Sequence, residues 1–147
     1  MRKWTLLLML LLTALSVAAA DNNKNSEEIE KLKAKAPAED ANGQVKAFTK
    51  IAELQMKQLS TAYDQGNNAE AEAALQDVLH YGVKAAHTAQ ESHKRMKQTE
   101  IALRKICDRL SDIGRSLSFE ERQPVTDAVN KLETARSDLL HAMFRKR

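Results

Sequence analysis

The longest regular pattern in the chain lies in residues 75–117, which read LQDVLHYGVKAAHTAQESHKRMKQTEIALRKICDRLSDIGRSL. When the first residue of this stretch is position a of a seven-residue repeat, the later a positions are Gly82, Ala89, Met96, Leu103, Leu110 and Leu117, after Leu75 itself. The matching d positions are Val78, Ala85, Ser92, Thr99, Ile106 and Ile113. Such a register, held without proline, is typical of a coiled-coil seam or of the core face of a long bundle helix.

This register predicts one continuous helix from about Ala69 to Ile113, roughly 70 Å long at 1.5 Å per residue. The middle of the seam is weak, because positions 82, 85, 89 and 92 all carry small residues. Small residues allow another helix to approach closely, or they mark a break between residues 86 and 93. No glycine–proline turn signal supports the break, so we predict the long helix. A four-helix bundle is the alternative if the helix does break there.

Shorter helices are expected on both sides of this segment. Residues 44–64 carry apolar side chains at three- and four-residue spacing, including Val45, Phe48 and Leu59. Ser118 and Glu121 have the spacing of a capping box for a last helix. The predicted fold is therefore all-α, with antiparallel helical hairpins forming a coiled-coil-like bundle around one long central helix. Each flanking helix would cover about half of the central one, which leaves surface for self-association.

The first twenty residues have the three parts of a secretory signal peptide. Arg2 and Lys3 precede an apolar run over residues 4–17, and small residues follow it. We predict cleavage after Ala20, with Ala18 and Ala20 at the positions that signal peptidase reads. The alternative is an uncleaved anchor, although the run is at the lower edge of a bilayer-spanning length. The chain is thus expected to be exported, periplasmic or secreted, and to touch a membrane only through this segment if it stays uncleaved.

Residues 21–43 are polar, and Ile29 and Leu32 are almost their only large apolar side chains. A segment with so little apolar surface is not expected to order itself. We therefore predict a flexible polar tether over 21–43, with at best a marginal helix inside it. The helical bundle domain is predicted to occupy residues 44–147.

The charge balance does not favour nucleic-acid binding. The chain has 23 basic and 20 acidic residues, for a net charge of +3. Arg2 and Lys3 supply two of these positive charges, so removal of the export segment would leave a net charge of +1. A nearly neutral chain lacks the basic surface that a nucleic-acid partner requires.

Residues that could carry chemistry are few. The single cysteine, Cys107, cannot form an internal disulfide, so it could form an intermolecular disulfide or remain buried. His80, His87 and His93 are seven and six residues apart, which is not the i, i+3 or i, i+4 spacing of helical metal ligands. We expect no catalytic residue, no cofactor and no metal site.

One polar patch interrupts the seam at Ser92, His93, Thr99 and Glu100. The main interpretation is a solvent-facing flank of the helix. If the helix breaks, however, these four side chains could line a binding pocket.

Two functions are compatible with these features. We favour an exported, non-enzymatic helical interaction or structural protein that binds a protein partner or forms a homo-oligomer. The alternative is a periplasmic helical bundle that binds a small ligand or a metal. The composition is similar to that of many small exported helical proteins, periplasmic four-helix bundles included, but no motif allows site residues to be transferred from them.

Overall fold

The computed structural model describes residues 20–145, and all regular structure in that range is helical. This confirms the all-α prediction. Residues 20–35 form an N-terminal helix that leads into a short 3-10 helix, η1. The elements after residue 35 are η1 (Ala36–Ala38), α2 (Ala41–Asp64), α3 (Asn68–Ser92), α4 (Met96–Ser116) and α5 (Phe119–Phe144).

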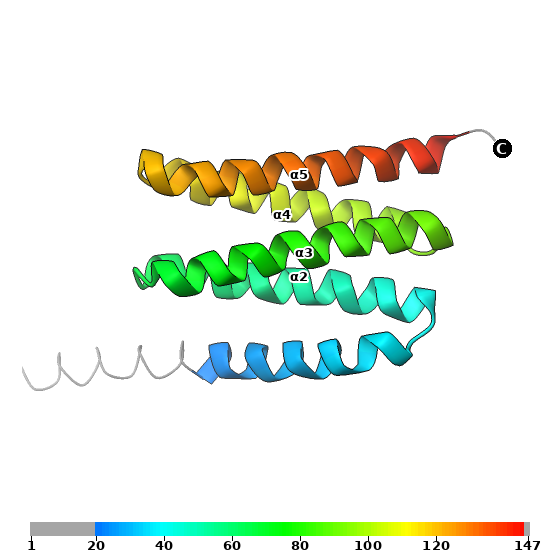
Figure 1. Cartoon of the computed structure of the whole chain (residues 1–147), viewed down its shortest axis with the longest axis horizontal. Coiled ribbons are helices and arrows are strands. Elements are labelled where there is room, and N and C mark those ends of the chain that lie inside the picture. Colours follow the sequence, from blue (N-terminus) through cyan, green and yellow to red (C-terminus); the bar gives the residue numbers. More distant parts are fainter. Residues whose placement is uncertain (1–19, 146–147) are drawn as a thin grey trace, which may run out of the picture.

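The helices form two antiparallel hairpins, α2–α3 and α4–α5, that pack side by side (Figure 1). Helices α3 and α4 contact each other in the centre of the bundle, whereas α2 and α5 lie on opposite sides of it. Helices α3 and α5 run in the same direction along the molecule. The N-terminal helix is a further layer on the outside of the α2–α3 hairpin.

The prediction of a single helix from Ala69 to Ile113 is wrong. The chain turns between Ser92 and Met96, so the four-helix alternative describes the bundle. His93 and Arg95 both adopt left-handed backbone conformations, with φ of 55° and 54°. Neither residue is a glycine, although histidine is among the residues that tolerate this conformation better than most. Folding back at this turn lets the two halves of the seam bury each other.

The predicted core register nevertheless holds on both sides of the turn. None of the a and d positions from Leu75 to Leu117 is exposed. The small residue at position 82 allows close packing, because a Cβ atom on Gly82 would lie 2.7 Å from Cδ2 of Leu132 in α5. With both halves covered inside one chain, the argument for self-association from an under-covered long helix no longer applies.

The helix ends follow their sequence signals. The side chain of Asp40 accepts a hydrogen bond from the backbone N–H of Gly43 at 2.8 Å, at the start of α2. Gly66, with φ of 69°, lies in the turn that follows α2. The predicted capping box of Ser118 and Glu121 is confirmed at the start of α5. Satisfied backbone groups at these ends fix where each helix begins.

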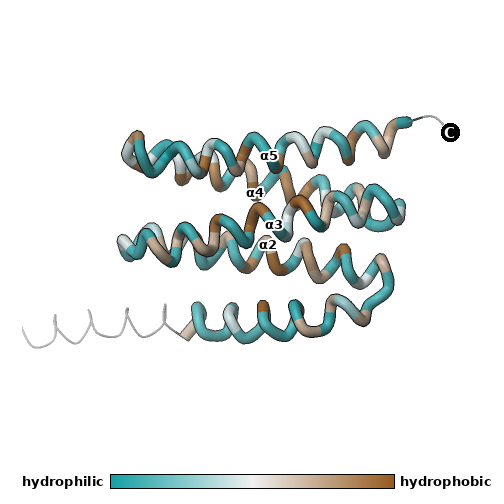
Figure 2. Tube along the Cα trace, viewed as in Figure 1, coloured by the Kyte–Doolittle hydropathy of each residue, from teal (hydrophilic) through white to brown (hydrophobic). Residues whose placement is uncertain are grey.

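The segment predicted as a tether is instead a packed helix. Ile29 is 2% exposed, and it lies in a core cluster with Phe48 and Ile51 of α2 and Ala85 of α3. Figure 2 shows that the N-terminal helix is mostly hydrophilic, as its sequence requires. It is ordered because its few apolar side chains use the apolar surface of α2 and α3, which supplies the burial that the segment lacks on its own.

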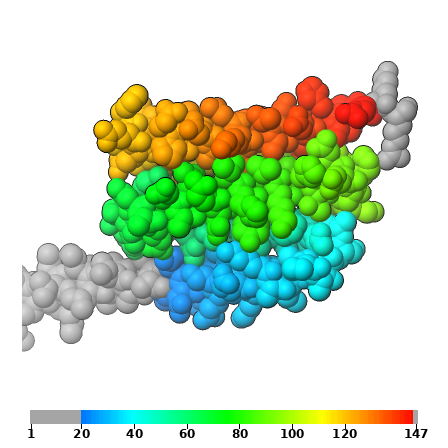
Figure 3. Space-filling view, viewed as in Figure 1, coloured from blue at the N-terminus to red at the C-terminus, as the bar shows by residue number. Residues whose placement is uncertain are grey.

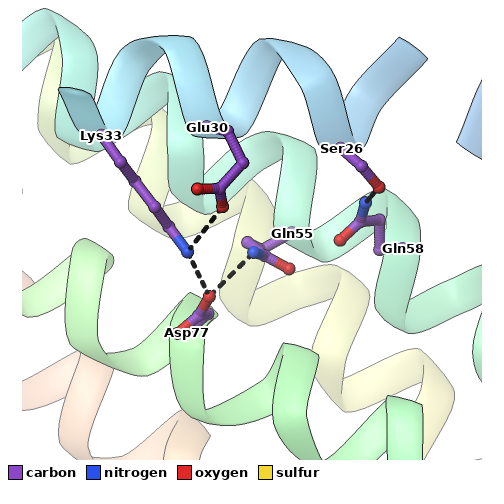
Figure 4. A network of polar contacts seen from close by, with 6 residues as sticks. All are labelled: Ser26, Glu30, Lys33, Gln55, Gln58 and Asp77. Atoms are coloured by element: carbon purple, nitrogen blue, oxygen red, sulfur yellow. Dashed lines mark hydrogen bonds and ion pairs between the residues drawn. The ribbon is translucent and has the colours of Figure 1, made fainter. Parts of the chain in front are cut away.

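Polar contacts complete this attachment (Figure 4). Lys33 of the N-terminal helix donates to Oδ2 of Asp77 in α3 at 3.1 Å, and Gln55 of α2 donates to the same oxygen at 2.8 Å. Elsewhere along the same two helices, Gln58 of α2 donates to Oγ of Ser26 in the N-terminal helix at 2.7 Å. Asp77 therefore links three helices.

Candidate protein-interaction groove

The four residues of the predicted polar patch do not converge on one site. Ser92 lies at the turn, where its Oγ donates to the backbone carbonyl of Thr88 and accepts from the N–H of Lys94. His93 is exposed beside it. Thr99 is 1% exposed and lies on the α2 side of α4, whereas Glu100 pairs with Arg136 on the α5 side. The helix break that the pocket hypothesis needs is present, but the pocket is not formed by these four residues.

Glu100 was assigned to a solvent-facing flank, and this assignment is wrong because α5 covers it. Arg136 of α5 forms ion pairs with Glu100 at 2.9 Å and with Glu133 at 2.8 Å. Hydrogen bonds to these two carboxylates raise the pKa of Arg136. The cluster ties α4 to α5 in a partly buried setting, where removing one partner would leave a charge uncompensated.

The thiol of Cys107 lies beside this cluster. It is 2% exposed, and burial, followed by the negative charge of Glu133, raises its pKa from 9.0 to about 12. A thiol of this kind is protonated at neutral pH and is a poor nucleophile. A disulfide to another chain would require the side chain to leave this position.

A groove of about 610 Å³ runs between α3 and α5. Figure 3 shows this boundary between the green and the orange helices along the length of the molecule. The groove is lined by apolar residues between polar and charged ones: Gln76, Leu79, His80, Val83, Ala86, His87, Gln90, Lys131, Thr134, Ala135 and Asp138.

Val83 marks the groove as an unusual surface. At 37% exposure it is one of three large hydrophobic residues that are exposed in residues 20–145. The other two, Phe119 and Phe144, lie at the two ends of α5, whereas Val83 lies in the middle of α3. An apolar patch framed by polar side chains, away from helix ends, is the pattern of a surface that contacts another protein.

The groove was not predicted from the sequence, although the sequence contains an apolar pattern that indicates it. Leu79, Val83 and Ala86 follow one another at four- and three-residue spacing, which is a second apolar stripe beside the a/d seam. The seam faces the core of the bundle, where Gly82 packs against Leu103 of α4 and Leu132 of α5, so the second stripe needs another neighbour. Helix α5 covers it incompletely, because Ala135 is the only apolar side chain that α5 contributes to the groove.

A second cleft, of about 740 Å³, lies along α2 between the N-terminal helix and α4. Thr99 lines it, and its hydroxyl oxygen is buried without a hydrogen-bond partner among the described residues. Its rims carry charges of both signs, such as Lys46, Lys50, Glu39 and Glu53. In the part of the chain that the structure describes, no group of three or more His, Cys, Asp or Glu side chains could hold a metal ion.

The predicted cleavage residue Ala20 is exposed at the first described position, while Ala18 and the rest of the export segment lie outside the described residues. No helix within residues 20–145 has the length and hydropathy needed to cross a bilayer. Comparisons of the chain with protein-family models, with curated proteins and with solved structures gave no match.

Proposed function

We propose that this chain is an exported, non-enzymatic helical protein that works by binding another protein through the α3–α5 groove. The observation that carries the proposal is the exposed apolar stripe around Val83, in the middle of a helix and framed by polar side chains. Export is inferred from the signal pattern of residues 1–20, so the expected compartment is periplasmic or extracellular.

The reactive side chains that lie between α4 and α5 support a binding role. The carboxylates of Glu100 and Glu133 are engaged by Arg136, and the thiol of Cys107 is buried and protonated. General acid–base or nucleophilic catalysis needs such groups to be accessible to a substrate and suitably ionised. These groups instead hold α4 and α5 together.

The chain itself provides a precedent for how such a groove is filled. On the other side of α3, the N-terminal helix packs Ile29 against α2 and α3 and adds polar contacts around it. The α3–α5 groove has the same ingredients, with an apolar stripe between polar rims. A helical face of a partner protein is therefore the expected occupant.

The proposal is tested by photo-crosslinking in the native envelope. A photoreactive amino acid is placed at Val83 in the groove and, as the matched control, at Lys57, an exposed position on α2 outside the groove. We expect a defined protein adduct from position 83 and none of the same mass from position 57. Equal adduct patterns from both positions, or no adduct from position 83, would contradict the proposal.

A second candidate function is the small-ligand or metal carrier. Two features favour it: the helix break, and the cleft beside Thr99, whose hydroxyl oxygen has no hydrogen-bond partner among the described residues. Purification from the native host, followed by metal analysis, an absorbance spectrum and native mass spectrometry, tests it. A bound mass that is lost in Thr99→Val would favour the carrier, whereas protein that is free of metal, chromophore and ligand would count against it.

A further inference from the structure

We propose that the occupant of the α3–α5 groove is a second copy of this chain, packed antiparallel about a two-fold axis next to Val83. This inference rests on the proposed function, because it names the partner of the same groove. It does not depend on the earlier expectation of an under-covered long helix, which the structure removed. It depends on three elements of the groove that match when the order is reversed: Val83 with itself, Gln76 with Gln90, and Lys131 with Asp138.

The two ends of the α3 stripe are symmetric about Val83. Gln76 and Gln90 lie at equal distances along the helix on either side of it, and both line the groove. In an antiparallel pair centred at this point, each Val83 faces the other, and Gln76 faces Gln90 of the second copy. Val83 then meets Val83 at the centre, the two α3 histidines of the groove lie opposite Leu79 and Ala86, and amide side chains that can donate to and accept from each other meet at the rim.

The stripe on α5 adds charge complementarity. Lys131 and Asp138 both line the groove, seven residues apart. When α5 runs antiparallel to its copy, Lys131 of one chain faces Asp138 of the other, and the same pair forms twice because of the symmetry. A two-fold axis parallel to the helices would instead place α5 opposite α3 of the other copy, and this pair would not form. The charges therefore select the antiparallel orientation.

The two stripes have nearly the same centre, as a single axis requires. The α3 stripe is centred at Val83, and the α5 stripe is centred between Thr134 and Ala135. Gly82 and Leu132 are in close contact where α3 and α5 pack together, and the two helices run in the same direction. Each of these residues is within one helical turn of its centre, so both centres lie at the same level along the bundle.

The size of the surface predicts a weak dimer. Helices α3 and α5 are each about 10 Å wide, and the stripe from Gln76 to Gln90 is about 20 Å long. The contact surface is therefore about 400 Å² on each copy. This is below the roughly 800 Å² per partner of a standard stable interface. We therefore expect at most a weak, reversible dimer, and not a permanent one.

Disulfide trapping tests the geometry. The chain is expressed with its export segment and purified as the host processes it, and single cysteines are introduced on the exposed groove surface. Val83→Cys should form a disulfide-linked dimer with itself under mild oxidation, while Gln76→Cys alone should not. An equimolar mixture of Gln76→Cys and Gln90→Cys should form the mixed dimer. The parent protein is the blank, because Cys107 is buried.

Charge reversal tests the pairing independently of any disulfide. Lys131→Asp and Asp138→Lys should each weaken the dimer by about tenfold or more, because each creates two like-charge contacts. The double variant should restore the affinity to within about threefold of the parent, because it regenerates both pairs with the roles exchanged. Lys57→Asp, an exposed change on α2, is the matched control and should have no effect.

The outcomes separate this inference from the proposed function. Gln76→Cys linking to itself, or a double charge variant that stays as weak as the singles, would overturn the antiparallel dimer. If the chain is a strict monomer but position 83 crosslinks to a different protein, the second copy is wrong and the proposed function stands. If position 83 crosslinks to nothing and the chain is monomeric, both fail. Circular dichroism of each variant checks that the helices are intact.

Discussion

The two grooves that flank α3 differ in what fills them. Between α2 and α3 the N-terminal helix buries Ile29 and directs Lys33 onto Asp77. Between α3 and α5 no part of residues 20–145 fills the groove, and Val83 remains 37% exposed. Both surfaces carry an apolar stripe at helical spacing. The chain therefore covers one apolar stripe with its own N-terminal helix. The stripe in the α3–α5 groove stays uncovered, which makes it a candidate for contact with another protein.

The largest contrast is expected from truncating one apolar side chain on each surface. Ile29→Ala should lower the free energy of unfolding by about 2 to 4 kcal/mol, because it removes a fully buried side chain. Val83→Ala should change it by no more than about 0.5 kcal/mol at concentrations where the protein is monomeric. Urea unfolding followed by circular dichroism measures both. Equal losses would mean that the groove is as well packed as the filled one.

Burial of the thiol predicts a loss of stability at high pH. The pKa of Cys107 is raised to about 12, so the unfolded chain releases this proton from about pH 9 while the folded protein keeps it. The contribution is complete below pH 9 and is lost as the pH rises from 9 to 12. At pH 10 the folded protein should be about 1 kcal/mol less stable relative to a Cys107→Ala variant than it is at pH 7.

The same burial predicts a contrast in reactivity between the two regions. In the native protein, Cys107 should react with a maleimide far more slowly than a cysteine introduced at Val83, by at least about a hundredfold. In denaturant the two should react at similar rates. Mass spectrometry of the labelled peptides measures both rates. Fast native labelling of Cys107 would show that α4 and α5 open readily.

A smaller contrast is expected from the polar residues. Asp77→Ala removes the acceptor shared by Lys33 and Gln55 and should cost about 1 kcal/mol, since the side chain is partly exposed. Asp138→Ala, in the open groove, should stay within about 0.5 kcal/mol in the monomer. Chemical denaturation of both variants decides the point. A cost at Asp138 equal to that at Asp77 would indicate an internal partner for the groove.

The sequence predicts the core of the bundle well, because heptad spacing reports which side chains share a helix face. The a and d positions from Leu75 to Leu117 face the core as the register predicts, and the capping box at Ser118 forms as expected. The turn after Ser92 could not be predicted in this way. The register continues through it, and the left-handed residues there, His93 and Arg95, are not the glycines that usually mark such a turn.

The N-terminal helix and the groove show two further limits. Local composition cannot indicate that residues 20–35 are stabilised by a surface on α2 and α3, because that surface exists only after the bundle has formed. The patch residues Thr99 and Glu100 are adjacent in sequence, but they face α2 and α5 respectively, since successive helical positions point about 100° apart. The second apolar stripe through Val83 is present in the sequence, but only the packing shows that α5 does not cover it.

The central claim is that the open α3–α5 groove binds a second copy of the chain, and sedimentation velocity tests it most directly. Between about 1 and 100 µM, we expect the parent protein to shift from monomer towards dimer, as a weak, reversible dimer does. Val83→Asp, which would place two carboxylates at the centre of the dimer, should remain monomeric with unchanged helix content. A parent protein that stays monomeric over the whole range, or a Val83→Asp variant that dimerises equally well, would contradict the account.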